Sequence, residues 1–192
     1  EAVIRDDLLA AVAAKIEDVA IEGGGSNEPT GITQTSGIGS VALATNGSNP
    51  TWAGVTALVK EVEQDNAALS NSQAFLTNPK VKHKMSGTAK VGSSDSVMIL
   101  DAPWTELYGY PIGITSHVPS DLTKGSTSGT CSAMIFGDFG QMMIGFWSAT
   151  DVLVDPYTGG PQGNIRILVH QDLDVAVRHA QSFAACLDIT TT

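Results

Sequence analysis

Charged side chains are scarce in this 192-residue sequence: they make up 16% of it, against about 25% in typical soluble domains. Most of them are negative, with 20 acidic and 10 basic side chains and a net charge of −10. A domain that neutralises nucleic-acid phosphates needs a stripe of Lys and Arg, so this balance argues against that class. One basic segment exists, which we interpret as a solvated, lysine-rich surface, with a nucleic-acid contact as the alternative. It contains Lys80, Lys82, His83 and Lys84, with Lys90 beyond them.

Cysteine is rarer still: Cys131 and Cys186 are the only two, and they fit no metal-binding spacing such as CxxC. We predict two buried free thiols, which favours a reducing compartment. The sequence has no run of about 18 apolar residues, and no basic segment precedes an apolar one. We therefore predict neither a membrane span nor a signal peptide. Because the first residue is Glu1 rather than Met, within a predicted helix, we expect a truncated, processed or trimmed chain.

Catalytic and cofactor-binding motifs are also missing. The glycine loop at 23–26 follows a helix and has no lysine, unlike a P-loop, so we interpret it as a helix cap. Residues 125–129 lack the spacing of GxSxG, and we interpret Asp138, which has no evident partner acid or base, as a turn residue. The four histidines show neither HExxH nor HxH spacing, and we expect them to bond to backbone groups. They are His83, His117, His170 and His179. We predict no catalytic residue, no cofactor and no metal site.

Helical patterning comes early in the chain and strand patterning late. Residues 2–21 carry an apolar stripe at helical spacing, which ends at three glycines. A second helix is predicted from Pro50 to about Ser70, and a short basic helix from Pro79 to Ser86. Apolar runs predict strands or short strand-like pieces at 40–44, 74–76, 97–100, 131–136, 142–147, 151–154, 165–170, 175–179 and 182–187. This order favours an α+β fold rather than repeated βαβ units.

Four short elements follow one another in an order that is more specific than any of them alone. The helix and its glycine loop lead into Pro29-Thr30-Gly31-Ile32, and a short strand ends at Asn78-Pro79. Later come the turn Leu107-Tyr108-Gly109-Tyr110-Pro111-Ile112 and, between two strands, Phe136-Gly137-Asp138-Phe139. With these elements the sequence resembles the major capsid proteins of tailed bacteriophages over roughly residues 2–186. Arg166 and Arg178 are both placed to match an arginine that this family often carries on its final return strand.

The resemblance implies the Hong Kong 97-type coat fold, which encapsulin nanocompartments share. It implies a peripheral part at 1–36 with the end of the family's spine helix, an axial domain at 37–155, and strands that return toward the peripheral part at 156–192. The family's N-terminal arm and extended hairpin should precede Glu1. Because the lysine that some members cross-link lies on that hairpin, no cross-linking chemistry is assigned to this chain.

The resemblance also implies a structural protein, not an enzyme, that builds pentamers and hexamers of an icosahedral phage head. Its partners would be copies of itself, a scaffolding protein, a portal and a maturation protease, without a membrane. The virion would be assembled in the bacterial host cytoplasm and would enclose double-stranded DNA without sequence-specific binding. The alternatives are an encapsulin-type compartment, a phage tail or adaptor protein, and an enzyme with an unrecognised site.

Aromatic residues are the sequence's candidates for subunit contacts, since aromatic side chains in strands fill either a core or an interface. Trp104 and the segment Tyr108 to Tyr110 lie in a predicted loop, so we expect them at an interface. We expect the remaining aromatic candidates to fill a core or an interface rather than a ligand pocket. They are Trp52, Trp147, Phe136, Phe139 and Phe146.

Overall fold

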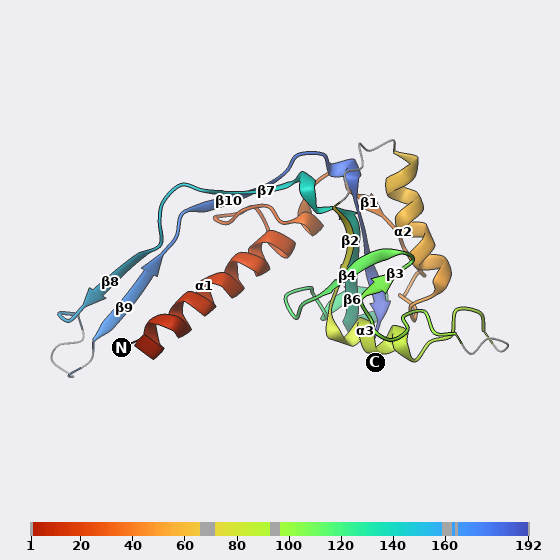
Figure 1. The fold of residues 1–192 in the computed structure, drawn as a ribbon, viewed down its shortest axis with the longest axis horizontal. Coiled ribbons are helices and arrows are strands. Elements are labelled where there is room, and N and C mark those ends of the chain that lie inside the picture. Colours follow the sequence, from red (N-terminus) through yellow and green to blue (C-terminus); the bar gives the residue numbers. More distant parts are fainter. Residues whose placement is uncertain (1, 66–71, 93–96, 159–162, 164, 192) are drawn as a thin grey trace.

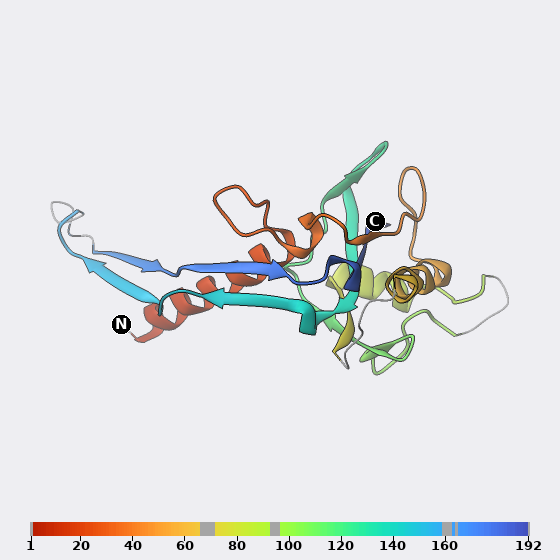
Figure 2. The ribbon, with the colours of Figure 1, turned by 90° about the horizontal axis from the view of Figure 1, so that it is seen from above.

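The computed structural model describes residues 2–65, 72–92, 97–158, 163 and 165–191. The molecule consists of a body, built around a mixed sheet with helices beside it, and an elongated arm (Figure 1). The arm contains one long helix and two β-ribbons that run beside it (Figures 1 and 2). This mixture of helices and sheet confirms the predicted α+β class.

A seven-stranded sheet forms the centre of the body, in the order β1-β11-β6-β2-β4-β3, with β5 paired to β6. The pairs β6–β11, β2–β6, β5–β6 and β3–β4 are antiparallel, whereas β1–β11 and β2–β4 are parallel. The strands are β1 (Gly39–Ser40), β2 (Gln73–Thr77), β3 (Glu106–Leu107), β4 (Tyr110–Ile114), β5 (Leu122–Lys124), β6 (Thr127–Asp138) and β11 (Phe183–Thr190).

The central strand β6 is buried on both faces, because its alternate side chains enter two different cores. Met134 and Phe136 pack with the helices α2 (Trp52–Gln64) and α3 (Pro79–Ser86). Ala133 and Ile135 pack on the other side with Ile21 and Phe183, among others. Both faces of this strand are thus covered within a single chain.

Both body helices begin at a side-chain cap. The Thr51 hydroxyl accepts the backbone N–H of Gly54 at 3.1 Å, and the Asn78 carbonyl oxygen accepts that of Val81 at 2.9 Å. The Asn-Pro pair therefore ends β2 and starts α3, whose predicted bounds are confirmed. Helix α2 starts two residues after Pro50, and the predicted extension over 66–70 lies outside the described residues.

The arm begins with α1 (Ala2–Glu22), close to the predicted 2–21. Its first ribbon pairs β7 (Met142–Phe146) with β10 (Leu173–Val177), and its second pairs β8 (Asp151–Asp155) with β9 (Arg166–His170). Burial in α1 is concentrated in its last turn, at Val19, Ala20 and Ile21. The rest of the helix extends away from the body (Figure 1).

The glycine loop after α1 closes through backbone contacts that leave no room for side chains. The N–H of Gly31 donates to the carbonyl of Gly23 at 2.8 Å. A Cβ atom on Gly31 would lie 2.6 Å from the backbone nitrogens of Glu22 and Gly23. The Pro-x-Gly-Ile element thus folds back onto the end of the helix because glycine permits this approach. The short 3₁₀ helix η1 (Ile32–Gln34) follows.

Several segments differ from the prediction. Of the strand predicted at 40–44, only Ser40 lies in a strand, as the second residue of β1. The residues after Val41 form a loop, in which the backbone N–H of Leu43 donates to the side chain of Asp188. The apolar run 97–100 contributes Ile99 and Leu100 to the core without forming a strand. Gly137 and Asp138 are still part of β6, and the turn itself is η2 (Phe139–Gln141).

Tyr108 and Gly109 form a two-residue hairpin turn between β3 and β4. Tyr108 and Gly109 both have positive φ, 55° and 81°. Positive φ at both central positions is typical of the tight turns that match the twist of antiparallel strands. Tyr110 consequently starts a strand rather than lying in a loop.

Strand pairing bears on how the chain divides. The predicted boundary between residues 155 and 156 falls between β8 and β9, which pair with each other. β11, which lies in the predicted return segment 156–192, is a central strand of the body sheet. The division into 1–36, 37–155 and 156–192 as domains stays a prediction.

Candidate subunit-contact surfaces

Large apolar side chains are exposed mainly along the arm. Trp147 is 72% exposed, and Phe146 beside it 58%. Exposed apolar side chains gathered on one part of a molecule indicate a site of association, since soluble monomers rarely leave large apolar areas open. The exposed apolar side chains of the arm, which we call the arm surface, are Val3, Ile4, Leu9, Met143, Ile144, Phe146, Trp147, Leu153, Val154, Tyr157 and Ile165.

Two grooves run between α1 and the ribbons. The outer groove is mainly apolar, with Ile4 and Leu8 of α1 facing Val152, Val154, Ile165 and Ile167. The inner groove lies nearer the body, where Trp147 and Leu173 face Val12, Ile16 and Val19 of α1. Helix and ribbons therefore pack loosely against each other, and apolar surface is left between them.

The ribbons also have open edges. Within the described part of the chain, each of β7, β8, β9 and β10 pairs with one other strand. An unpaired strand edge offers free backbone N–H and C=O groups to another chain, and isolated two-stranded ribbons have little stability of their own. The arm thus has both apolar side chains and backbone groups available for contacts.

The loop around Trp104 forms a second exposed aromatic surface, on the body beside α3. Trp104 is 44% exposed and Tyr108 49%. Lysine ammonium groups lie over two tryptophan rings here: that of Lys82 is 4.9 Å from the Trp104 ring centroid, and that of Lys90 is 4.4 Å from the Trp52 ring centroid. Trp52 in turn meets Tyr108 edge-to-face, with centroids 5.6 Å apart.

Tyr110 differs from its neighbours. Its ring packs against Phe136 at 5.0 Å and against Phe75 at 6.4 Å, as part of the core beneath α2. Desolvation, followed by the nearby Glu63 carboxylate, raises the pKa of the Tyr110 hydroxyl. The structure therefore places Tyr108 on the predicted contact surface and Tyr110 in the core.

The remaining aromatic candidates separate in the same way. Phe136 is fully buried, and Phe139 packs edge-to-face on Phe183 at 5.6 Å. Phe146 and Trp147 belong to the exposed arm surface instead. Sequence reasoning missed this surface as a whole, because apolar strand residues were expected to fill either a core or an interface, and the pattern is the same for both.

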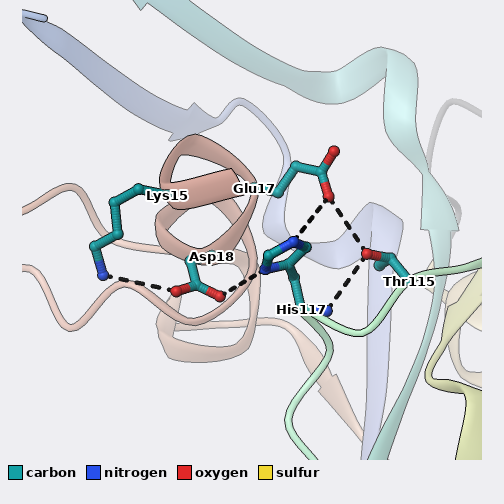
Figure 3. Close-up of polar contacts among 5 residues, drawn as sticks. All are labelled: Lys15, Glu17, Asp18, Thr115 and His117. Carbon is teal, nitrogen blue, oxygen red and sulfur yellow. Dashed lines mark hydrogen bonds and ion pairs between the residues drawn. The ribbon is translucent and has the colours of Figure 1, made fainter. Parts of the chain in front are cut away.

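His117 makes contacts that the sequence did not predict (Figure 3). Its Nδ1 lies 3.0 Å from Oδ1 of Asp18, and its Nε2 lies 3.7 Å from Oε2 of Glu17. The expectation that this histidine bonds to backbone groups is wrong, because the loop after β4 brings its ring against the last turns of α1. The other three histidines are exposed, on α3, at the end of β9 and before the 3₁₀ helix η4 (Ala180–Ser182).

Asp138 ends β6 and caps the turn that follows, rather than lying within that turn. It is fully buried, and its carboxylate accepts the N–H of Gly140 at 3.0 Å, which caps η2. Within the described residues, no group of three or more His, Cys, Asp and Glu side chains could hold a metal ion. In that same part of the chain, no helix is long and apolar enough to cross a membrane.

Both cysteines are free and buried, as predicted. Desolvation raises the pKa of the Cys186 thiol to about 12, and desolvation also raises that of Cys131. The Cys186 thiol lies 3.2 Å from the carboxylate of Asp188, a buried residue that also accepts the backbone N–H of Leu43 at 2.9 Å. These thiols are placed for packing rather than for reaction.

The basic segment lies on α3 and the loop that follows it. Lys80 is exposed and reaches the carbonyl oxygen of Ser120 at 3.5 Å, whereas Lys82 and Lys90 lie over aromatic rings. Arg166 and Arg178 are exposed at the start of β9 and just after β10. These cations are spread over both parts of the molecule.

The sequence matches the phage capsid family over residues 1–186. The chain belongs to the phage capsid family. It is 25% identical, over 187 residues, to the major capsid protein of Halomonas phage phiHAP-1. The matched region covers 96% of this chain and 28% of that relative. The predicted resemblance is therefore confirmed.

Solved structures show the same coat fold. The capsid of an empty GTA particle superposes with a TM-score of 0.71 and 19% identity, over 98% of this chain and 66% of that one. A structure from Gordonia phage Cozz gives a TM-score of 0.66 and 16% identity, over 96% and 62%. The SrpI encapsulin of Synechococcus elongatus PCC 7942 gives a TM-score of 0.62 and 14% identity, over 98% of this chain and 66% of that one. The chain thus spans less than two thirds of the length of each of these relatives.

Proposed function

We propose that this chain forms the wall of a phage head, in which identical copies assemble into pentamers and hexamers of an icosahedral shell. The observation that carries the proposal is the arm surface: apolar side chains and open strand edges project from a body that has its own buried core. Rings of identical subunits need contacts in which one face meets a different face of the neighbour. The arm surface and the Trp104 loop, which lies on the body beside α3, are two different faces of this kind.

The shell would contain double-stranded DNA without reading its sequence. The net charge of −10 keeps the protein from adhering strongly to a polyanion. A scaffolding protein, a portal and a maturation protease are the partners that we propose, with assembly of the virion in the bacterial host cytoplasm. This role needs no catalytic residue, because it depends on surfaces rather than on a reactive site.

The first test is electron microscopy of the particles formed when the gene that encodes this chain is expressed alone and with its neighbouring genes. Closed polyhedral shells, or rings of five and six subunits, are the expected result. Enclosed DNA distinguishes a phage head from an encapsulin, which would enclose protein. Small, uniform particles under every assembly condition would contradict the proposal and favour an enzyme, and open tubes would favour a tail protein.

The arm surface has a test of its own. The double substitution Phe146→Ser with Trp147→Ser removes two large, exposed apolar side chains, so the subunit should still fold while assembly is lost. Folding is checked by circular dichroism and assembly by sedimentation velocity. Val91→Ser, at a residue 59% exposed in the body, is the matched control. Normal assembly of the double variant would exclude this part of the arm surface from the contact.

Trp104→Ala tests the other face in the same assay. Because Trp104 is exposed, its removal should weaken assembly and leave the subunit folded. The substitution also removes the ring over Lys82, so a thermal melt of the unassembled variant is needed to separate the two effects. Unchanged assembly would remove Trp104 from the interface.

A further inference from the structure

The junction between α1 and the body holds a small cluster of titratable groups, drawn in Figure 3. Asp18 and Glu17, on adjacent positions of α1, approach the two ring nitrogens of His117 at 3.0 and 3.7 Å. Thr115 donates its hydroxyl to Glu17 at 3.3 Å and accepts the backbone N–H of His117 at 3.4 Å. About one hundred residues of chain separate the two sides of this contact, 98 between Glu17 and Thr115 and 99 between Asp18 and His117.

The geometry matches a protonated histidine. An imidazolium has two N–H donors, one for each carboxylate, whereas a neutral imidazole has only one. Loss of the proton therefore leaves one ring nitrogen with its lone pair facing a carboxylate oxygen. It also removes the positive charge that lies between two negative ones. The side chain of His117 is 27% exposed, so solvent weakens these interactions without removing them.

Acidic groups outnumber basic ones around this contact. On α1, Lys15 lies 3.8 Å from Asp18, and Glu22 follows one turn later. On the body side, Asp121 interacts with Glu22. Desolvation raises the pKa of the Glu22 carboxyl, and so do Asp121 and Asp18, whereas Lys15 lowers it. A proton on either His117 or Glu22 thus reduces the excess negative charge of the junction by one unit.

The apolar contact at the same place is small. Ile21 packs with Val118, next to His117, in the core cluster on this face of the sheet. Towards its N-terminus, α1 extends away from the body (Figures 1 and 2). A helix of 21 residues is about 30 Å long, so a rotation of about 10° at its end moves the other end by about 5 Å. Small changes at this junction are therefore amplified along the arm.

We propose that His117 is a pH-dependent latch, which holds α1 at one angle to the body when protonated and lets that angle vary when neutral. A histidine gains its proton as the pH falls through roughly 6.5, and carboxylates lose their charge only near pH 4. The latch therefore strengthens as the histidine gains its proton, and weakens again once the carboxylates that face it lose their charge. Protonation of Glu22, with its raised pKa, acts in the same direction as the pH falls.

The proposal adds regulation to the proposed function, since copies that meet through the arm surface would meet at an angle that depends on pH. Only this consequence for a shell rests on the proposed function. The latch itself is a property of the single chain and can be tested on it, so failure of one proposal is distinguishable from failure of the other.

The test is a distance measurement by pulsed electron spin resonance. Spin labels are attached at Asp7→Cys on α1 and Lys60→Cys on α2, both exposed positions, while the buried Cys131 and Cys186 stay unlabelled. The expected result is a narrow distance distribution at about pH 5.5 and a broader one, with its mean displaced by about 5 Å, at about pH 8. The same distribution at both pH values would overturn the proposal.

Matched variants identify the group responsible. His117→Gln keeps a polar side chain but does not titrate, so its distribution should be broad at both pH values. Asp18→Asn removes the closer carboxylate and provides the same test should His117→Gln fail to fold. His179→Gln, at an exposed histidine distant from α1 in the sequence, should keep the response of the unsubstituted chain. A His117→Gln variant that responds to pH as the unsubstituted chain does would exclude His117 as the latch.

Discussion

At the scale of single residues, glycines and buried polar groups hold the connections between elements. Gly31 allows the loop after α1 to fold onto the helix end, and buried Asp188 holds the 41–48 loop through its bond from Leu43. Neither residue stands out by composition, since the chain has 20 glycines and 20 acidic residues. Their importance comes from the backbone groups that they meet.

Gly31→Ala tests the first of these contacts. The new methyl group would lie 2.6 Å from the backbone of Glu22 and Gly23, so the variant should lose about 1–3 kcal/mol of unfolding free energy. Urea denaturation followed by circular dichroism measures this loss. Gly92→Ala, where a Cβ atom meets nothing within 4 Å, is the control and should be close to neutral. Equal stabilities of the two variants would show that the loop relaxes at no cost.

The thiols give a pH prediction. Because burial raises the pKa of Cys186 to about 12, the thiol stays protonated at pH 8. Native protein should therefore resist alkylation by iodoacetamide at pH 8, and react only as the chain unfolds. Mass spectrometry with and without urea measures this difference. Rapid alkylation of native Cys186 would show that the strand around Asp188 opens easily.

At the scale of elements, the helices of this chain differ in how much of their surface is covered. α2 presents a continuous apolar face to the core, with Val55, Leu58 and Val62 fully buried. α1 buries little beyond its last turn, and its exposed apolar residues belong to the arm surface. α2 is held by the body, whereas α1 needs further contacts along most of its length.

Two leucine substitutions separate these roles. Leu58→Ala removes a fully buried side chain, so the unfolding free energy should fall by about 2–5 kcal/mol. Leu9→Ala, at a residue 44% exposed, should change it by no more than about 0.5 kcal/mol. Assembly, measured by sedimentation velocity, should respond in the opposite order: Leu9→Ala should reduce the fraction of assembled protein more than Leu58→Ala does. A large loss of stability from Leu9→Ala would mean that α1 is part of the folding core.

At the scale of the whole molecule, charge and apolar surface oppose each other in self-association. Copies with a net charge of −10 repel one another, whereas the arm surface attracts them. Salt screens the repulsion within about 10 Å at 0.1 M and leaves apolar contacts intact. The balance should therefore move toward assembly as the ionic strength rises.

A salt titration checks this balance. Analytical ultracentrifugation between about 0.05 and 0.5 M NaCl should show a rising fraction of assembled protein. The Phe146→Ser and Trp147→Ser double variant should remain unassembled at every salt concentration. Salt weakens the repulsion between its copies, but the apolar side chains that would hold them together have been removed. Dissociation at high salt would instead indicate contacts dominated by opposite charges.

The sequence by itself determined the elements whose signals are local. The apolar stripe and the glycines predicted α1, the Asn-Pro pair predicted the start of α3, and the ordered motifs identified the family. Periodicity and capping act within a few residues, so they can be read without the rest of the chain. The exposed contact candidates Trp104 and Tyr108 also followed from their predicted loop.

Only the tertiary structure decided which residues far apart in the chain meet, and which apolar residues remain uncovered. It placed Tyr110 in the core, brought His117 against Asp18, and left only Ser40 of the strand predicted at 40–44 in a strand. It also left Phe146 and Trp147 exposed on a ribbon. An alternating strand pattern is the same whether its apolar face meets the chain's own core or a neighbour, because burial depends on packing between distant segments.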